Sequence, residues 1–217
     1  MALATIDEAL KRIRRGEMVL VVDDEERENE GDLTMAASWA TAEAVNFMLR
    51  WARGLVCMPC SPDRLDELGM PPMLAPGTET CDTAFAVTID HVTAGSGISA
   101  QDRALTIRSV LDPDSKPTDF IRPGHVFPLR AKPGGVLERR GHTEAAVDLA
   151  RLAGLPPVAV ICEVLHDDGS PARMQFLELF ASEHRIAMIS VEQVAAYREA
   201  DAAGRSSARR STAPLLL

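Results

Sequence analysis

Helix-forming and strand-forming segments alternate along the whole chain, and this alternation restricts the fold more than any other feature of the sequence. Two helix starts carry a capping box, Thr5 with Glu8 and Ser190 with Gln193. Short apolar runs, such as residues 18–22 and 157–165, lie between the helical segments and are typical of buried strands. The pattern predicts one α/β (α+β) domain, a layered sandwich of a mixed sheet and helices.

The positions of capping and breaking residues set the expected elements. Helices are expected over residues 5–15, 41–54, 62–69, 99–110, 143–154, 170–182 and from 190 onward, and strands over residues 18–22, 33–37, 85–90, 157–165 and 186–189. The segment 112–135 is rich in proline and glycine and is expected to form an ordered loop with short strands. The domain is expected to occupy residues 1–200, followed by a flexible tail over residues 201–217.

Composition and charge exclude several classes of function. The formal net charge of -9 argues against binding to nucleic acid or to an anionic membrane, because both require basic surface. No apolar run is long enough to span a membrane, and residues 1–8 lack the pattern of a signal peptide, so we expect a cytoplasmic protein. Cys57 and Cys60 form a CxxC without a second ligand pair, and Cys60, Cys81 and Cys162 are interpreted as reduced structural thiols.

The densest chemical signal is the acidic run at residues 23–32, Asp-Asp-Glu-Glu-Arg-Glu-Asn-Glu-Gly-Asp. Crowded carboxylates repel one another, so compact packing needs a nearby cation or strong solvation, and their hard oxygens suit magnesium or calcium. A solvated loop is the usual meaning of such a run. This run, however, lies between two apolar segments, and Gly31 indicates a specific turn. An EF-hand is rejected, because a loop starting at Glu26 would place Ala37 where the bidentate Glu is required.

A second signal is the segment Arg139-Arg140-Gly141-His142-Thr143 at the expected start of a helix. Helix N-terminal amides and guanidinium groups favour an anion such as phosphate, and His142 adds a possible metal ligand. Taken alone, a structural capping turn explains the segment equally well. The acidic run favours the functional interpretation, because phosphate and metal commonly occur together in sugar-phosphate sites.

Three weaker signals remain. The small-residue loop 93–99 precedes a helix and could cradle phosphate, although such loops are also common turns. His125 lies in a loop rigidified by prolines, where a lone histidine is more often structural than catalytic. Glu163 shares its strand face with Ile161 and Leu165, which favours burial, and a buried carboxylate needs a partner such as histidine or a metal.

Together these segments resemble the 3,4-dihydroxy-2-butanone 4-phosphate synthase family. The matching stretches are residues 23–33 (DDEERENEGDL), 53–59 (RGLVCMP), 82–90, 96–108 and 122–146. The most specific motifs are RENEGD and RRGHTEA in this order, with RPGHVFPL between them. The similarity spans nearly all of residues 5–198.

The resemblance implies a carbon–carbon lyase of riboflavin biosynthesis that converts D-ribulose 5-phosphate to L-3,4-dihydroxy-2-butanone 4-phosphate and formate, with Mg²⁺ or Mn²⁺ and two ions per site. By similarity, Glu28 and His142 bind metal, and Glu30 lies near the second ion. The implied substrate-binding set comprises Arg27, Glu28, Asp32, Ser96, Arg139, Arg140, Gly141, His142, Thr143 and Glu163. His125 and Glu163 are the implied acid–base residues, Asp32 is a further candidate for the first base, and Cys57 is implied to line the site.

The resemblance also implies a homodimer with sites near the subunit interface, a small sugar phosphate as the substrate, and neither nucleic acid nor membrane as a partner. Some relatives carry a fused GTP cyclohydrolase II domain, and we expect none in this chain. Two alternatives stay open: another magnesium-dependent sugar-phosphate lyase or isomerase on the same fold, and a non-catalytic protein that binds divalent ions.

Overall fold

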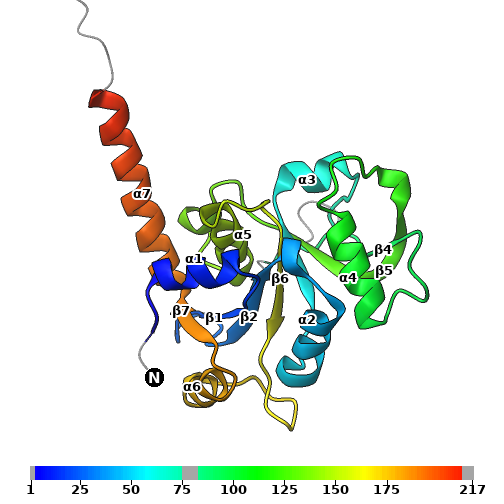
Figure 1. The fold of residues 1–217 in the computed structure, drawn as a ribbon, viewed down its shortest axis with the longest axis horizontal. Coiled ribbons are helices and arrows are strands. Elements are labelled where there is room, and N and C mark those ends of the chain that lie inside the picture. Colours follow the sequence, from blue (N-terminus) through cyan, green and yellow to red (C-terminus); the bar gives the residue numbers. More distant parts are fainter. Residues whose placement is uncertain (1–2, 75–82, 212–217) are drawn as a thin grey trace, which may run out of the picture.

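The computed structural model describes residues 3–74 and 83–211, and its helices and strands form one layered α/β unit (Figure 1). The helices are α1 (Ile6–Arg14), α2 (Ala42–Phe47), α3 (Pro62–Glu67), α4 (Ala100–Ser109), α5 (His142–Leu152), α6 (Met174–Glu183) and α7 (Val191–Ser211). The strands are β1 (Val19–Val22), β2 (Gly31–Ala36), β3 (Cys57–Cys60), β4 (Ile89–His91), β5 (Phe120–Arg130), β6 (Ala159–Glu163) and β7 (Ala187–Ser190). None of the described helices is both long and apolar enough to cross a membrane.

The strands form a seven-stranded mixed sheet in the order β4-β5-β3-β6-β2-β1-β7. The pairs β1–β7 and β3–β5 are parallel, whereas β1–β2, β2–β6 and β3–β6 are antiparallel. The expected mixed α/β sandwich is therefore confirmed. Every residue of β1 and β2 is buried, as expected for strands covered on both faces.

Alternating residues of β1 contribute to two separate cores. Leu20 and Val22 pack with side chains of α2, α4 and α6, whereas Val19 and Val21 pack with side chains of α1, α5 and α7. The figure shows α1, α5 and α7 on one side of the sheet and α2 and α6 on the other (Figure 1). This double cover leaves the ends of the strands as the places where polar side chains can gather.

Several element boundaries differ from the expected ones. The helix expected over 41–54 ends as α2 at Phe47 and continues as a π-helical turn, Met48–Ala52, which Arg53 closes in the left-handed region. The expected helix over 170–182 begins only at Met174, because Pro171 bridges to Leu165 beforehand. The proline-rich segment 112–135 contains one long strand, β5, in place of short strands.

Two further expectations concern segments that lie partly outside the described residues. The last helix continues to Ser211, into the segment expected as a flexible tail, and residues 212–217 lie outside the described part. Cys60 and Cys162 are buried free thiols, as expected, and Cys57 is a buried free thiol as well. Cys81 and the first residue of the matching stretch 82–90 lie outside the described residues.

Candidate active site

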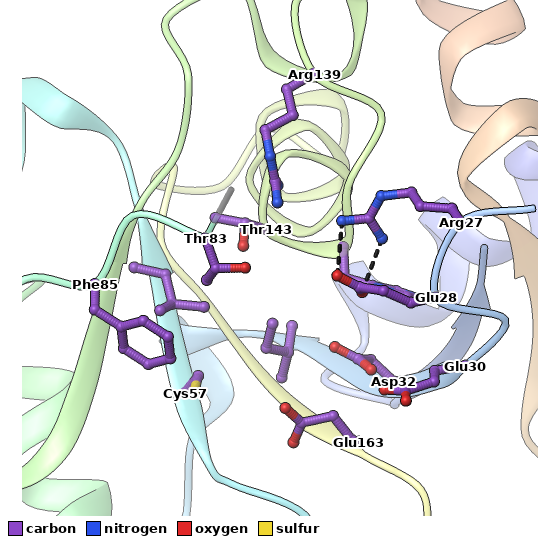
Figure 2. Close-up of a pocket in the computed structure, with 13 residues that line it drawn as sticks. Arg27, Glu28, Glu30, Asp32, Cys57, Thr83, Phe85, Arg139, Thr143 and Glu163 are labelled. Atoms are coloured by element: carbon purple, nitrogen blue, oxygen red, sulfur yellow. Dashed lines mark hydrogen bonds and ion pairs between the residues drawn. The ribbon is translucent and has the colours of Figure 1, made fainter. Parts of the chain in front are cut away.

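A cavity of about 220 Å³ lies where the acidic loop, the start of β2, the end of β6 and the N-terminus of α5 meet (Figure 2). Acidic, basic and apolar groups share its wall, so it offers both charge recognition and partial exclusion of water. Its lining consists of Arg27, Glu28, Glu30, Asp32, Cys57, Thr83, Phe85, Leu129, Arg139, His142, Thr143, Ile161 and Glu163. The predicted convergence of the acidic run and the downstream Arg-Gly-His-Thr segment is therefore seen in one cavity.

Two carboxylates enter the cavity from neighbouring strands. Asp32 of β2 and Glu163 of β6 are direct partners in the antiparallel ladder, so their side chains point to the same face (Figure 2). The pKa of Asp32 is raised to about 7: burial is the main cause, His142 opposes the shift, and the nearby charge of Glu163 adds to it. A carboxyl group with this pKa can accept or release a proton near neutral pH.

Glu163 is held by the turn that precedes β3. Its Oε2 accepts a hydrogen bond from the amide of Leu55 at 2.8 Å. A Cβ atom at Gly54 would lie 2.4 Å from the carbonyl oxygen and 2.5 Å from the Oε2 of Glu163. The glycine in the Arg-Gly-Leu-Val-Cys segment is thus required so that the backbone can approach this carboxylate.

The acidic run is folded around one of its own members. The Asp23 side chain is only 1% exposed and accepts hydrogen bonds from the amides of Glu28 at 3.2 Å and Glu30 at 2.8 Å. Its Oδ2 also lies 2.6 Å from Nη1 of Arg27. From the start of α6, Arg173 donates to the carbonyl oxygen of Glu28 at 2.7 Å. These contacts argue against a merely solvated loop and fix the backbone of the loop at Glu28.

Glu28, His142 and Asp23 together fit a divalent cation. One ligand atom from each of the three residues lies within 4.8 Å of the other two. The Nδ1 atom of His142 and the Oε2 atom of Glu28 are 3.7 Å apart. The Nε2 atom of His142 is buried and has no hydrogen-bond partner in the described part of the chain. A carboxylate–imidazole set with an unused buried nitrogen suits a divalent cation.

The charges of these ligands are strongly coupled. The ion pair with His142 lowers the pKa of Glu28 to about 2; burial opposes this shift, and Arg27 reinforces it through two hydrogen bonds at 2.8 and 3.1 Å. Burial acts to lower the pKa of His142, but the carboxylates of Asp32, Glu28 and Asp23 outweigh it and raise the value to about 9. Arg27 therefore supplies positive charge to the acidic cluster, and a bound cation would compete with the proton of His142.

The opposite side of the cavity is suited to an anion. Arg139 points into the cavity toward Thr143 (Figure 2), and its Nε and Nη2 atoms are buried without a hydrogen-bond partner among residues 3–74 and 83–211. Its Nη1 donates to Glu144 at 2.6 Å, which holds the guanidinium in place. Gly141 is the N-cap of α5, and a Cβ there would lie 2.2 Å from Arg139 Nη1. Free guanidinium donors beside a helix N-terminus favour a phosphate group.

Four residues of the predicted site set are not among the cavity-lining residues: Gly141, the N-cap of α5 next to the lining residue His142, and three that lie further away. Arg140 forms ion pairs with Glu192 and Glu199 of α7. His125 pairs with Asp90, with Nδ1 and Oδ2 2.7 Å apart. Ser96 lies in the loop before α4, next to Gly97, and like His125 it is not among the cavity-lining residues.

Sequence reasoning missed several wall residues. Thr83, Phe85, Leu129 and Ile161 line the cavity, although none of them was named as a site residue. Each had a signal: Ile161 alternates with Glu163 along one strand, Leu129 ends the RPGHVFPL motif, and Thr83 and Phe85 lie in the matching stretch 82–90. Cys57, in contrast, lines the cavity as the resemblance implied, and burial raises the pKa of its thiol, so it is a neutral part of the wall.

The chain matches the family model described as 3,4-dihydroxy-2-butanone 4-phosphate synthase over residues 7–197. It is 55% identical over 197 residues to the riboflavin biosynthesis protein RibBA of Aquifex aeolicus, covering 89% of this chain and 48% of that protein. It is 50% identical over 198 residues to the 3,4-dihydroxy-2-butanone 4-phosphate synthase of Agrobacterium fabrum, covering 91% and 93%. The chain thus spans about half the length of the RibBA relative and nearly all of the second.

Solved structures agree with this relationship. A two-domain 3,4-dihydroxy-2-butanone 4-phosphate synthase, RibBX from A. baumannii, matches with a TM-score of 0.87 and 45% identity, covering 90% of this chain and 58% of that one. A 3,4-dihydroxy-2-butanone 4-phosphate synthase in complex with two magnesium ions matches with a TM-score of 0.85 and 41% identity, covering 90% and 97%. The chain therefore belongs to the 3,4-dihydroxy-2-butanone 4-phosphate synthase family.

Proposed function

We propose that this protein converts D-ribulose 5-phosphate to L-3,4-dihydroxy-2-butanone 4-phosphate and formate in riboflavin biosynthesis. The observation that carries the proposal is one cavity with three kinds of group: a cation-binding set around Glu28 and His142, unpartnered donors of Arg139, and the carboxyl groups of Asp32 and Glu163. A phosphorylated sugar needs an anion site, a site for its oxygens and groups that transfer protons, and the cavity offers all three.

The reaction balances as a loss and a gain of one water around a rearrangement. A base removes a proton from carbon 3 of the sugar, and an acid helps the hydroxyl of carbon 1 to leave as water. The carbon skeleton then rearranges, and addition of water releases carbon 4 as formate. Asp32, with its pKa near 7, and Glu163 directly opposite it are placed to exchange protons with the sugar. The apolar wall of Phe85 and Ile161 limits water around the reactive intermediates.

We assign the cation as Mg²⁺, with Mn²⁺ as a substitute. Glu28 and His142 would hold it, and when bound it supplies positive charge for the negative charge that develops on the sugar oxygens. Glu30 lies two residues after Glu28 on the same loop and lines the same cavity, and this supports a second ion nearby. The relative that holds two magnesium ions supports the count of two.

His125 enters the proposal through a second copy of the chain. It is predicted to transfer protons, yet it does not line the cavity of its own chain. A homodimer in which His125 of the partner subunit reaches the cavity reconciles these two points, and the family resemblance implies sites near a subunit interface.

The test of the reaction is formate release from D-ribulose 5-phosphate and Mg²⁺. The wild type should release one formate per sugar, whereas Glu163→Gln should remain folded and lose at least about a hundredfold in kcat, as expected when an acid–base group is removed. Glu183→Gln, a glutamate at the end of α6 outside the cavity lining, is the matched control and should keep wild-type turnover. A new pentose phosphate without formate would favour an isomerase, and Mg²⁺ binding without any product would favour an ion-binding protein.

Mixing two inactive variants tests the shared site. Glu163→Gln and His125→Asn are each expected to be inactive alone. After mixing and exchange of subunits, half of the dimers are mixed and each has one intact site, so about a quarter of wild-type activity should return. Activity that stays absent after proven exchange would contradict a site built from two subunits.

A further inference from the structure

We propose that Asp90 is the positioning residue for His125: it determines which ring nitrogen carries the proton and leaves the other nitrogen free for proton transfer. The catalytic consequence of this inference rests on the proposed function. The claim that Asp90 orients the imidazole of His125 does not depend on the proposed function, because it is drawn from contacts within one chain.

The Asp90 carboxylate grips His125 at two points. Its Oδ1 accepts the backbone amide of His125 at 2.9 Å, and its Oδ2 lies 2.7 Å from the ring Nδ1. Asp90 is 8% exposed, whereas the side chain of His125 is 42% exposed. The carboxylate is therefore packed inside, while the imidazole extends from it toward the surface.

The backbone around this pair is shaped to bring the two residues together. The β4–β5 ladder shifts register between Ile89 and Asp90, as at a β-bulge, a feature that commonly redirects side chains near active sites. Gly124 approaches β4 so closely that a Cβ would lie 2.1 Å from the carbonyl carbon of Ile89. Only glycine allows this approach, and it places the His125 amide against Asp90.

A glycine loop also closes over the contact. Gly97 has a φ of +84°, and a Cβ there would lie 2.1 Å from Asp90 Oδ2 and 2.6 Å from His125 Nδ1. The loop thus covers the edge of the ring at which the two side chains meet. Water has little access to this edge, so the Asp90 oxygen is the acceptor available to Nδ1.

This geometry selects one tautomer. A carboxylate accepts hydrogen bonds and donates none, so a neutral imidazole facing it must carry its proton on Nδ1. The lone pair then lies on Nε2, the nitrogen directed away from Asp90. An orienting carboxylate of this kind serves a histidine that must accept a proton at a defined position.

Other residues already hold the surrounding loops, so Asp90 is not needed merely to fix the loop backbone. Thr88 accepts the amide of Gly124 at 3.0 Å, and Asp102 accepts the amides of Gly95 at 2.9 Å and Gly97 at 3.2 Å. Asp102 has no contact with the ring of His125 that the structure describes. It therefore offers a matched control on the same loop.

The decisive variant is Asp90→Asn, which preserves shape and removes the charge. The backbone amide of His125 still needs an acceptor, so the Asn oxygen should take the Oδ1 position and its NH₂ group should face Nδ1. An NH₂ group donates, and the ring proton should therefore move to Nε2. Long-range ¹H–¹⁵N correlation spectra of the full-length protein, recorded at alkaline pH with His125 assigned through His125→Asn, report which nitrogen is protonated.

Measurements of kcat and KM then distinguish a role of Asp90 in positioning His125 from a merely structural role. Asp90→Asn should invert the nitrogen signature of His125 and lower kcat for formate release at least about tenfold, with KM for D-ribulose 5-phosphate changed less than about threefold. Asp90→Glu, which keeps the charge, should retain the wild-type nitrogen signature and more activity than Asp90→Asn. Asp102→Asn should keep the wild-type signature.

Two results would overturn the inference: an unchanged His125 tautomer in folded Asp90→Asn, or an inverted tautomer with wild-type kcat. The spectra need no turnover, so they remain informative if the wild type releases no formate. Absence of formate release by the wild type would contradict the proposed function, but the orientation of the His125 ring by Asp90 would stand as a separate finding.

Discussion

At the scale of single residues, the cavity concentrates charge that the fold would otherwise avoid. Asp32 is fully enclosed beside Glu163, and no lysine or arginine is hydrogen-bonded to it in the described part of the chain. Such groups are kept at functional sites despite their cost to stability. Asp32 should therefore reveal a conflict between stability and activity.

Asp32→Asn is expected to be more stable than the wild type at neutral pH and inactive in formate release. Burial raises the pKa of Asp32 from 3.8 to about 7, so ionising it costs the folded state more than the unfolded chain. This cost grows as the pH rises from about 4 to about 7 and then remains. Linkage gives a gain on the order of 1–4 kcal/mol for the variant above pH 7 and little gain near pH 4. Urea unfolding at both pH values, without divalent ions, measures it, and equal stabilisation at both would contradict the stated pKa.

Glu144 holds Arg139, the arginine proposed to bind the phosphate, and should influence substrate affinity without touching the substrate. Its Oε2 lies 2.6 Å from Arg139 Nη1, and its Oε1 accepts the amide of Lys132 at 3.1 Å. Glu144→Gln weakens the grip on the guanidinium, so KM should rise about tenfold while kcat changes less, since one charge-assisted hydrogen bond contributes roughly 1.5–3 kcal/mol. Glu138→Gln is the control, because Glu138 accepts the amide of Gly134 within the same turn. Equal KM values for both variants would argue against this role.

At the scale of elements, helix α5 carries the proposed metal ligand His142 and the proposed anion site at one end and is anchored along its length. Asp148 of this helix is fully buried, accepts the amide of Val136 at 2.9 Å and pairs with Arg198 of α7. The short turn Gly135–Leu137 precedes the Arg139 segment. One carboxylate thus ties α5, α7 and this turn together.

Asp148→Ala is expected to lower the free energy of unfolding by about 3–5 kcal/mol, because it leaves Arg198 with no buried partner and the amide of Val136 unsatisfied. Glu199→Gln removes an exposed ion pair with Arg140 and should cost less than about 1 kcal/mol. Denaturant titrations of both variants provide the comparison. Similar losses in the two would show that the buried pair has no special weight.

The same elements show what sequence could and could not provide. Capping residues located the helix starts well: Thr5, Thr41 and Ser99 accept the N-terminal amides that their spacing predicted. The opposition of Asp32 and Glu163 depends on strand register between segments far apart in sequence, which no local pattern encodes. The long strand β5 was not predicted, because a segment rich in proline and glycine is typical of a loop.

At the scale of the whole molecule, the meeting of the acidic run with the Arg-Gly-His-Thr segment could be predicted from motifs, whereas the place of His125 could not. The Glu28–His142 pair was expected from the resemblance and is found at 3.7 Å. The proposed approach of His125 of the partner subunit to the cavity depends on how chains assemble, and a single sequence contains no direct record of assembly.

Divalent ions are expected to stabilise the whole fold. Mg²⁺ at about one hundred times its Kd should add roughly 2.7 kcal/mol and raise Tm. The pKa of His142 is about 9 in the absence of metal, so protons compete with the ion below that pH and the rise in Tm should be larger at pH 9 than at pH 6. Glu28→Gln should abolish the rise, whereas Glu26→Gln, on the exposed part of the same loop, should keep it. A rise that persists in Glu28→Gln would place the ion elsewhere.

Because β2 pairs with β6, the placement of the two cavity carboxylates depends on the number of residues in each strand. Because side chains alternate between the two faces of a strand, deleting one residue from either strand would send Asp32 or Glu163 to the opposite face, into a core of aliphatic side chains. Insertions and deletions within these two strands should therefore be far more damaging than substitutions, whereas loops elsewhere in the chain can change length as long as the register of β2 with β6 is kept.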